Sequence, residues 1–238
     1  MTQCEVVIET MRANGGYATF GALNHLIDFS TWATKTPQAS VRRIVQNSDA
    51  FFRIQPGLWA LTGCKEEVLR KFSIKEKDEQ SEELFTHGYY QGILVKIGNM
   101  KSYTTYVPAQ DKNRLFLEQP LSEITRTTNI PNFTYPQLVN RARTVDVIWF
   151  NERGLPNSLF EVEHSTDIQN SVTKFCDLQD FKSQFVIVAP EHRHALFNKV
   201  MEHSAFRDIQ HLVRFVNYDT IVSQYEKMTE LAKLPDAI

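Results

Sequence analysis

Cysteine is scarce in this sequence of 238 residues: the three present, Cys4, Cys64 and Cys176, stand far apart. No two form a CxxC pair, which excludes a disulfide framework of the secreted type and a cysteine-rich zinc site. No apolar run approaches the ~18 residues that a membrane-spanning helix needs. The first residues mix acids with apolar side chains, unlike a signal peptide. We therefore expect a cytoplasmic protein with no membrane partner.

The sequence also lacks a strong charge of either sign and any phosphate-binding glycine loop. Its formal net charge of −2 excludes a histone-like basic protein but not a local basic surface. No Walker loop and no GxGxxG motif occurs, so nucleotide-driven chemistry has no support. With 42% hydrophobic and 23% charged residues, the composition is that of a globular protein with one or two domains.

Residues 1–64 have the pattern of a small helical unit that ends in a hairpin. Apolar residues at helical spacing predict a first helix that ends at Asn14-Gly15-Gly16, a second helix after Thr19 and a third after Pro37. Two short strand patterns flank the turn at Pro56-Gly57. Three helices followed by a hairpin predict a small winged helix-turn-helix domain.

Basic and polar side chains gather on the third helix and the hairpin of this unit. Four of the five basic residues in the range 1–64 lie between positions 35 and 53, where Asp49 is the only acid. Lys and Arg contact DNA phosphates and polar side chains read base edges, so we expect this face to bind double-stranded DNA. The predicted DNA-binding residues are Lys35, Thr36, Gln38, Ser40, Arg42, Arg43, Gln46 and Arg53. The alternative is a winged helix used for protein contact.

The same segment contains T-P-x-A-x-V followed by F-x-R-x-x-P-G-L-W-x-L. With these motifs, residues 4 to 62 resemble the HARE-type winged helix that is found beside chromatin and restriction domains. The resemblance implies a nucleic-acid-associated module at the N-terminal side of the chain.

Residues 65–81 are dense in charge, and we predict a charged linker there between two domains. The range 82–238 then alternates in the order helix, three strands, helix, strand, helix, strand. That order predicts an α/β fold with a mixed sheet flanked by helices. The polar stretch 125–144 contains two prolines, and we interpret it as a long functional loop.

Three carboxylates occur in two neighbouring strand patterns of the second range. Asp146 lies in VDVIWF, whereas Glu161 and Glu163 lie in NSLFEVEH. Residues two apart on a strand share a face, so the two glutamates project together and Asp146 completes the cluster from the adjacent strand. Crowded carboxylates favour a divalent cation, and hard oxygen ligands favour Mg²⁺, for which Mn²⁺ can substitute. The alternative is a solvated face of a half-buried sheet.

The series Asp146, FEVEHST and a helix with Lys174 and Asp177 resembles the PD-(D/E)XK nuclease superfamily, most of all its restriction endonucleases, over residues 82 to 225. The resemblance implies a restriction-endonuclease-like core and a type II, site-specific DNA endonuclease that depends on Mg²⁺. It also implies a homodimer, with one site for each DNA strand, and a cognate DNA methyltransferase in the same system. The site residues that it implies are Asp146 and Glu161 as metal ligands and Glu83, or else Glu82, as an auxiliary acid.

The sequence departs from the superfamily at Glu163, where lysine is usual. A glutamate there can act as a general base or as a further metal ligand, and Lys174 can lean back toward the site as a displaced lysine. Arg141 and Arg143 precede Asp146 and are predicted to hold the DNA backbone. A non-catalytic DNA-binding regulator with a degenerate nuclease domain is the competing hypothesis, and metal-dependent cleavage distinguishes the two.

Overall fold

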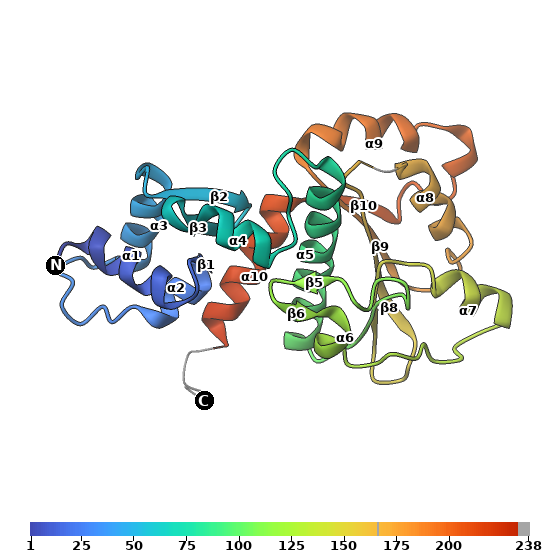
Figure 1. Ribbon diagram of the computed structural model, residues 1–238. Coiled ribbons are helices and arrows are strands. Elements are labelled where there is room, and N and C mark those ends of the chain that lie inside the picture. The colour runs from blue at the N-terminus through green and yellow to red at the C-terminus, as the bar shows by residue number, and fades with distance from the viewer. Residues whose placement is uncertain (166, 233–238) are drawn as a thin grey trace. The chain divides into compact units, whose positions relative to one another are not determined.

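The computed structural model describes residues 1–165 and 167–232, and the chain divides into two compact units (Figure 1). Unit 1 comprises Met1–Asp78 and Val222–Ile238, and unit 2 comprises Glu79–Ile221. Each unit has a sheet and a hydrophobic core of its own.

The two units differ in extent from the predicted ranges 1–64, 65–81 and 82–238. Most of the predicted linker belongs to unit 1, and so does the C-terminal stretch that was expected in the second domain. The physical reason is packing: the side chain of Val222 lies so close to Gly57 that a Cβ at Gly57 would come within 2.3 Å of it. Contacts between distant parts of the sequence, not chain order, decide where unit 1 ends.

Unit 1 consists of helices around a three-stranded antiparallel sheet with the strand order β1-β3-β2. Its strands are β1 (Tyr17–Thr19), β2 (Phe51–Gln55) and β3 (Leu58–Leu61). Its helices are α1 (Gln3–Ala13), α2 (Phe20–Leu26), α3 (Pro37–Asn47), the 3-10 turn η1 (Thr62–Cys64) and α4 (Lys65–Lys71). The three helices and the hairpin expected from the sequence are present, and β1 is an addition that pairs with β3.

Local sequence signals explain where the helices of unit 1 begin. Thr2 caps α1 and forms a capping box with Glu5, and Thr19 accepts a hydrogen bond from the N–H of Ala22 at the start of α2. Pro37 occupies the first turn of α3, where a backbone N–H has no helical partner. The apolar faces of these helices meet in one core, whose fully buried side chains include Val7, Met11, Leu23, Val41 and Val45.

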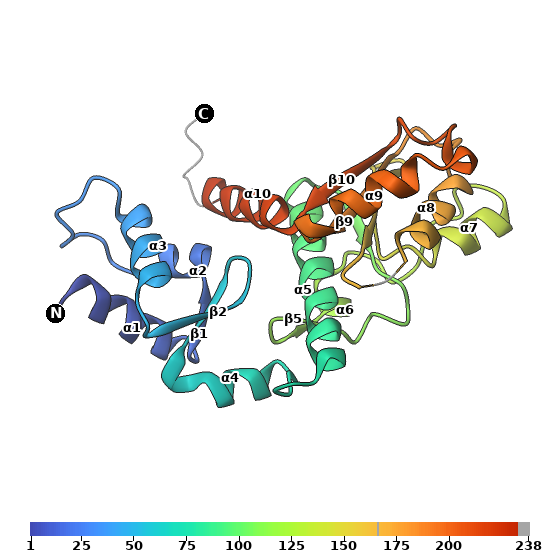
Figure 2. The ribbon, with the colours of Figure 1, turned by 90° about the horizontal axis from the view of Figure 1, so that it is seen from above.

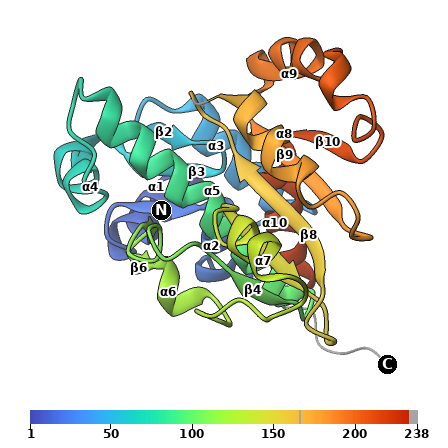
Figure 3. The same cartoon turned by 90° about the vertical axis from the view of Figure 1, so that its right-hand side faces the viewer.

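Unit 2 contains a five-stranded mixed sheet with the order β10-β9-β8-β7-β4 (Figures 1 and 3). The strands are β4 (Thr104–Tyr106), β7 (Val147–Phe150), β8 (Pro156–Val162), β9 (Gln184–Ala189) and β10 (Val213–Asn217). Strands β8, β9 and β10 are parallel, whereas β7 is antiparallel to both β4 and β8. The predicted α/β class with a mixed sheet flanked by helices is confirmed.

Helices cover both faces of this sheet (Figures 2 and 3). Helix α5 (Glu79–Met100) packs on one face, where the indole N–H of Trp149 on β7 donates to the backbone oxygen of Leu94. On the other face, α7 (Pro136–Ala142), α8 (Ile168–Cys176) and α9 (His194–Met201) share a core with Ile148, Leu159 and Ile187. The remaining elements are β5 (Leu115–Phe116), β6 (Gln119–Pro120), α6 (Leu121–Ile124), the 3-10 turns η2 (Glu191–Arg193) and η3 (Ser204–Phe206), and α10 (Tyr218–Leu231).

Three expectations for this range are corrected. The stretch 125–144, interpreted as a loop, contains helix α7, because Pro136 suits a helix start and Val139 and Ala142 supply a buried face. The expected strand VDVIWF begins only at Val147, two residues later than predicted, so Asp146 precedes β7. Helix α10 was not predicted at all, although its charged residues alternate with apolar ones. No described helix has the length and apolar character needed to cross a lipid bilayer.

Gly92 on α5 is a point where the fold allows no side chain. A Cβ there would lie 2.3 Å from Phe116 on β5. Gly92→Ala improves helix propensity by about 1 kcal/mol but forces overpacking that costs about 1–3 kcal/mol or more, so we expect a net loss of stability. Chemical unfolding measures it, with Gly63→Ala as the control because a Cβ at Gly63 meets nothing within 4 Å. Equal stability of the two variants would contradict the packing.

Candidate active site

The pairing of β7 with β8 brings the predicted carboxylates together. Val147 pairs with Phe160, so Asp146 stands opposite Glu161 where β8 ends. Asp146 Oδ2 accepts a hydrogen bond of 2.8 Å from the backbone N–H of Val162. Asp146, Glu161 and Glu163 are only 7%, 1% and 4% exposed, so this is a buried cluster and not the solvated face of a sheet.

Helix α8 supplies a cation and a hydroxyl to the same cluster. Lys174 Nζ lies 2.8 and 3.0 Å from the two carboxylate oxygens of Glu161, and it also donates to the backbone oxygen of Thr144. The hydroxyl of Ser171 contacts both Glu161, at 3.1 Å, and Glu163. Ser171 and Lys174 are three residues apart and therefore share a helical face. The expected approach of Lys174 to the carboxylates is thus present in the geometry.

The cluster holds more negative than positive charge. Burial raises the pKa of Glu161 well above its usual value, and the neighbouring Asp146 and Glu163 add to this, against the opposing effect of Lys174. Burial alone would lower the pKa of Lys174, but the neighbouring carboxylate of Glu161 has the larger opposite effect and holds this pKa above its usual value. Three carboxylates face one ammonium, and the excess negative charge suits a divalent cation.

Helix α5 and the loop after β4 reach Asp146 from another side. His87 Nε2 lies 3.4 Å from Asp146 Oδ2, and Gln91 Nε2 donates to the backbone oxygen of Asp146 at 3.1 Å and to Asp111 Oδ2 at 2.9 Å. Although Asp146 is buried, His87, the Val162 N–H and Lys174 together hold its pKa below the usual value. One donor atom each of His87, Asp111 and Asp146 lies within 4.8 Å of the other two, a spacing that can hold a metal ion.

The proposed auxiliary acid Glu83 lies on α5 and accepts a hydrogen bond from the hydroxyl of Ser165. Within the described residues no hydrogen bond joins Glu83 to Asp146 or Glu161, and Glu82 is exposed. Arg193, which is only 8% exposed, donates to the backbone oxygen of Glu163 at 3.4 Å. Arg193 is therefore a second buried cation beside the cluster.

The two arginines that precede Asp146 are both exposed and both engaged on the surface. Arg141 on α7 forms an ion pair with Asp177, and Arg143 donates to the side chain of Asn140 at 2.9 Å. The residue Asp177, which belongs to the motif that carried the superfamily resemblance, therefore contacts an arginine and not the carboxylate cluster.

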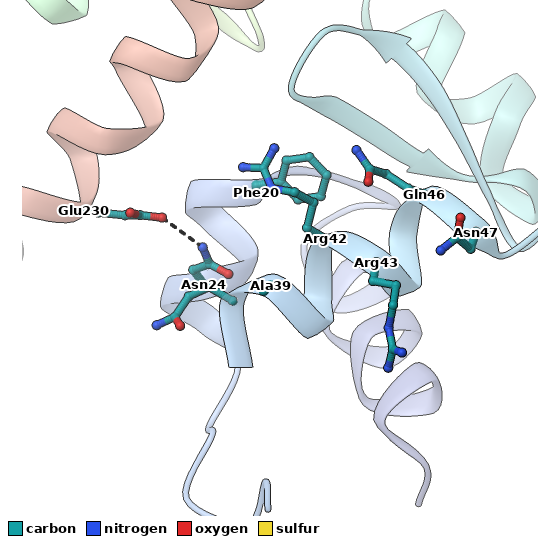
Figure 4. Close-up of a pocket in the computed structure, with 9 residues that line it drawn as sticks. Phe20, Asn24, Ala39, Arg42, Arg43, Gln46, Asn47 and Glu230 are labelled. Carbon is teal, nitrogen blue, oxygen red and sulfur yellow. Dashed lines mark hydrogen bonds between the residues drawn. The ribbon is translucent and has the colours of Figure 1, made fainter. Parts of the chain in front are cut away.

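In unit 1, the predicted DNA-binding residues are exposed except for the half-buried Ser40. Lys35 and Thr36 precede α3, Arg53 lies on β2, and Gln38, Arg42, Arg43 and Gln46 line one pocket of about 340 Å³ along α3 (Figure 4). Phe20 and Asn24 of α2 and Glu230 of α10 complete its wall.

Helix α10 adds acidic side chains to this basic surface. Arg42 lies 4.4 Å from the centre of the Phe20 ring and forms an ion pair of 2.8 Å with Glu226. Glu230 accepts a hydrogen bond of 3.2 Å from Asn24. Glu226 is only 7% exposed, and burial raises its pKa above the usual value. Arg42 is thus already paired, whereas Arg43 has no ion pair among the described residues.

The sequence reasoning missed His87, Asp111, Ser171, Arg193 and Glu226. His87 had a usable signal, because it lies one helical turn after Glu83 and so shares its face of α5. Asp111 and Arg193 had none, because each reaches the site from an irregular loop or a short turn. Glu226 is 184 residues from Arg42 in the sequence, and only the folded chain reveals their contact.

The sequence of the chain is similar to that of a type II restriction enzyme. A family model described as the C-terminal domain of the type II restriction enzyme NmeDI matches residues 68–237. The type II restriction enzyme NmeDI of Neisseria meningitidis serogroup C is 24% identical over 159 residues, which make up 62% of this chain and 42% of that enzyme. The aligned part thus spans less than half of the relative's length. No solved structure matches the chain.

Proposed function

Since residues 68–237 place the chain in the family of the NmeDI C-terminal domain, we propose that it is a metal-dependent DNA endonuclease of the PD-(D/E)XK type. The observation that carries the proposal is the buried cluster of Asp146, Glu161 and Glu163 with the ammonium of Lys174 on Glu161. A type II restriction activity on double-stranded DNA is the function that this cluster supports best.

Asp146 and Glu161 are the residues that would hold a divalent cation, because both are oxygen donors in a site with excess negative charge. Hard oxygen donors fit Mg²⁺, with Mn²⁺ as a substitute. A cation held by these two carboxylates would supply positive charge next to the scissile phosphate and would lower the pKa of a bound water. The donor set therefore fits the cofactor that the family implies.

The other side chains have roles that follow from their contacts. Glu163 accepts the proton of the attacking water, and the Ser171 hydroxyl orients its carboxylate. Lys174 favours the ionised form of Glu161 and brings a positive charge toward the phosphate, which compensates for the missing lysine at position 163. Arg193 holds the backbone of Glu163 in place.

Cleavage of DNA tests this proposal. We expect discrete fragments from a panel of methylated and unmethylated plasmid and phage DNA with Mg²⁺ or Mn²⁺, and no fragments with EDTA. Because a double-strand cut needs two active sites, the active species is a homodimer. Size-exclusion chromatography of the protein bound to DNA measures this oligomeric state. A cognate methyltransferase would protect the cleaved sites.

A non-catalytic DNA-binding regulator is the second candidate, favoured by Glu163 at the usual lysine position. The absence of cleavage under every metal and methylation state, together with salt-sensitive DNA binding, would support it. Cleavage that requires the carboxylate cluster excludes it.

Unit 1 is proposed to read DNA as a winged helix of the HARE type, with α3 in the major groove. Arg42 and Arg43 are adjacent cations on α3, but only the guanidinium of Arg42 forms an ion pair with an acid. Arg43→Ala should therefore weaken binding more than Arg42→Ala and lower the slope of log K against log salt by about 1. Fluorescence anisotropy at several salt concentrations measures both, with Glu226→Gln expected to tighten binding by releasing Arg42.

Equal losses for Arg42→Ala and Arg43→Ala would contradict the pairing with Glu226. Unchanged affinity in both would show that α3 is not the DNA-contacting helix and would favour a protein-docking role for unit 1.

A further inference from the structure

His87, Gln91 and Asp111 form a polar cluster inside unit 2 that the proposed mechanism does not use. His87 and Gln91 are one helical turn apart on α5, and Asp111 belongs to the loop between β4 and β5. Gln91 is fully buried and Asp111 is 2% exposed, whereas the His87 side chain keeps 17% of its surface. Asp146 joins the cluster from the start of β7.

Unsatisfied polar atoms gather in this cluster. Among the described residues, His87 Nε2, Gln91 Oε1 and Asp111 Oδ1 are buried side-chain atoms without a hydrogen-bond partner. Arg114 Nε lies 2.7 Å from Asp111 Oδ1 without the geometry of a hydrogen bond. His87 Nε2 and Asp111 Oδ1 thus have ion-pair neighbours, Asp146 and Arg114, whereas Gln91 Oε1 has no hydrogen-bond donor among the described residues. A buried polar atom without a hydrogen bond costs about 1–3 kcal/mol, so a ligand that engages this cluster would stabilise it.

The spacing and chemistry of the donors suit a metal ion. One atom each of His87, Asp111 and Asp146 lies within 4.8 Å of the other two. Donors bound at about 2.1 Å to one ion stand at most about 4.2 Å apart, so only a small shift of the side chains is needed. Arg114 compensates part of the negative charge of Asp111.

The imidazole decides which ion is favoured. Mg²⁺ prefers oxygen ligands and keeps several waters, whereas Mn²⁺, Co²⁺ and Zn²⁺ bind imidazole well. A mixed set of one imidazole and two carboxylates therefore discriminates against Mg²⁺, unlike the pair Asp146 and Glu161.

We propose that His87, Asp111 and Asp146 bind a divalent transition-metal ion, with Gln91 positioning the two aspartates. The site shares Asp146 with the proposed nuclease centre, so its role in cleavage rests on the proposed function. It adds His87 and Asp111 as ligands and predicts tighter binding of Mn²⁺ or Co²⁺ than of Mg²⁺.

Titration of the whole chain with Co²⁺, followed by visible absorption, tests the site without any cleavage assay, and electron paramagnetic resonance of Mn²⁺ repeats the test. We expect His87→Gln and Asp111→Asn to lower Co²⁺ affinity by about 100-fold or more, since even outer-shell changes cost about 10–100-fold. Glu161→Gln is the matched control within the nuclease centre and should leave the imidazole-dependent spectrum in place. For His87→Ala, added imidazole should restore Co²⁺ binding.

Three results separate the possible failures. Full Co²⁺ affinity in His87→Gln and Asp111→Asn, with loss in Glu161→Gln, overturns this site but leaves the proposed nuclease centre intact. If the protein binds a transition metal through His87 but cuts no DNA, the site is supported and the proposed nuclease function is contradicted. No binding of Co²⁺ or Mn²⁺ by the unaltered chain overturns this site, whereas cleavage of DNA with Mg²⁺ decides the proposed function separately. Circular dichroism establishes that each variant is folded, and the imidazole rescue distinguishes ligand loss from misfolding.

Discussion

Glu161→Gln is expected to reduce metal-dependent cleavage of DNA by about 1,000-fold or more while the chain stays folded. Metal activation of the attacking water and of the phosphate is worth several kcal/mol, and about 1.4 kcal/mol corresponds to a factor of ten in rate. Glutamine keeps the shape of the buried side chain and can still accept a hydrogen bond from Lys174. The change therefore removes the negative charge of a metal ligand and leaves the packing of the side chain nearly unchanged.

Single-turnover cleavage with Mg²⁺ and with Mn²⁺ measures this effect, and thermal unfolding measures the accompanying change in stability. Glu152→Gln is the matched control, because Glu152 is exposed in the turn between β7 and β8 and close in sequence to the site. A wild-type cleavage rate in Glu161→Gln would show that Glu161 takes no part in the reaction. Equal rate losses in both variants would point to damage of the hairpin and not of a metal site.

Strand periodicity made most of the carboxylate cluster predictable. Glu161 and Glu163 are two residues apart, so any strand through them presents both side chains on one face. The short connection before Pro156 made β7 and β8 neighbours, and this placed Asp146 opposite Glu161. The approach of Lys174 was a hypothesis that rested on the superfamily resemblance, and its contact with Glu161 depends on the packing of α8 against the sheet.

Contacts made by irregular segments were not predictable in the same way. Asp111 lies in a loop with no periodicity, and its position depends on the hydrogen bond that it accepts from Gln91 and on the turn that follows β4. Glu226 lies on α10, whose C-terminal part joins unit 1 through tertiary contacts with Gly57, Arg42 and Asn24. Because no local rule relates residues so distant in sequence, the limits of unit 1 could not be derived from composition or charge.

The pair of Lys174 and Glu161 leads to the second large effect. Their side chains are only 16% and 2% exposed, so removal of the ammonium leaves the buried carboxylate of Glu161 with the Ser171 hydroxyl but without its ion-pair partner. Breaking one partner of a buried pair costs about 3–5 kcal/mol, and we expect Lys174→Met to lose stability in this range in metal-free buffer. Lys199→Met is the matched control, since Lys199 also lies in the last turn of its helix but is exposed.

Two additions connect this loss to the proposed site. A divalent cation replaces the missing positive charge, so Mg²⁺ or Mn²⁺ should restore part of the stability of Lys174→Met, by an amount that grows with metal concentration. The double variant Lys174→Met with Glu161→Gln removes both charges and should be more stable than the sum of the single losses predicts, by about 1–3 kcal/mol. Chemical unfolding with and without metal measures all four proteins. Additive losses, or a Lys174→Met variant that metal does not stabilise, would show that the ammonium and the carboxylates do not share the charge of one site.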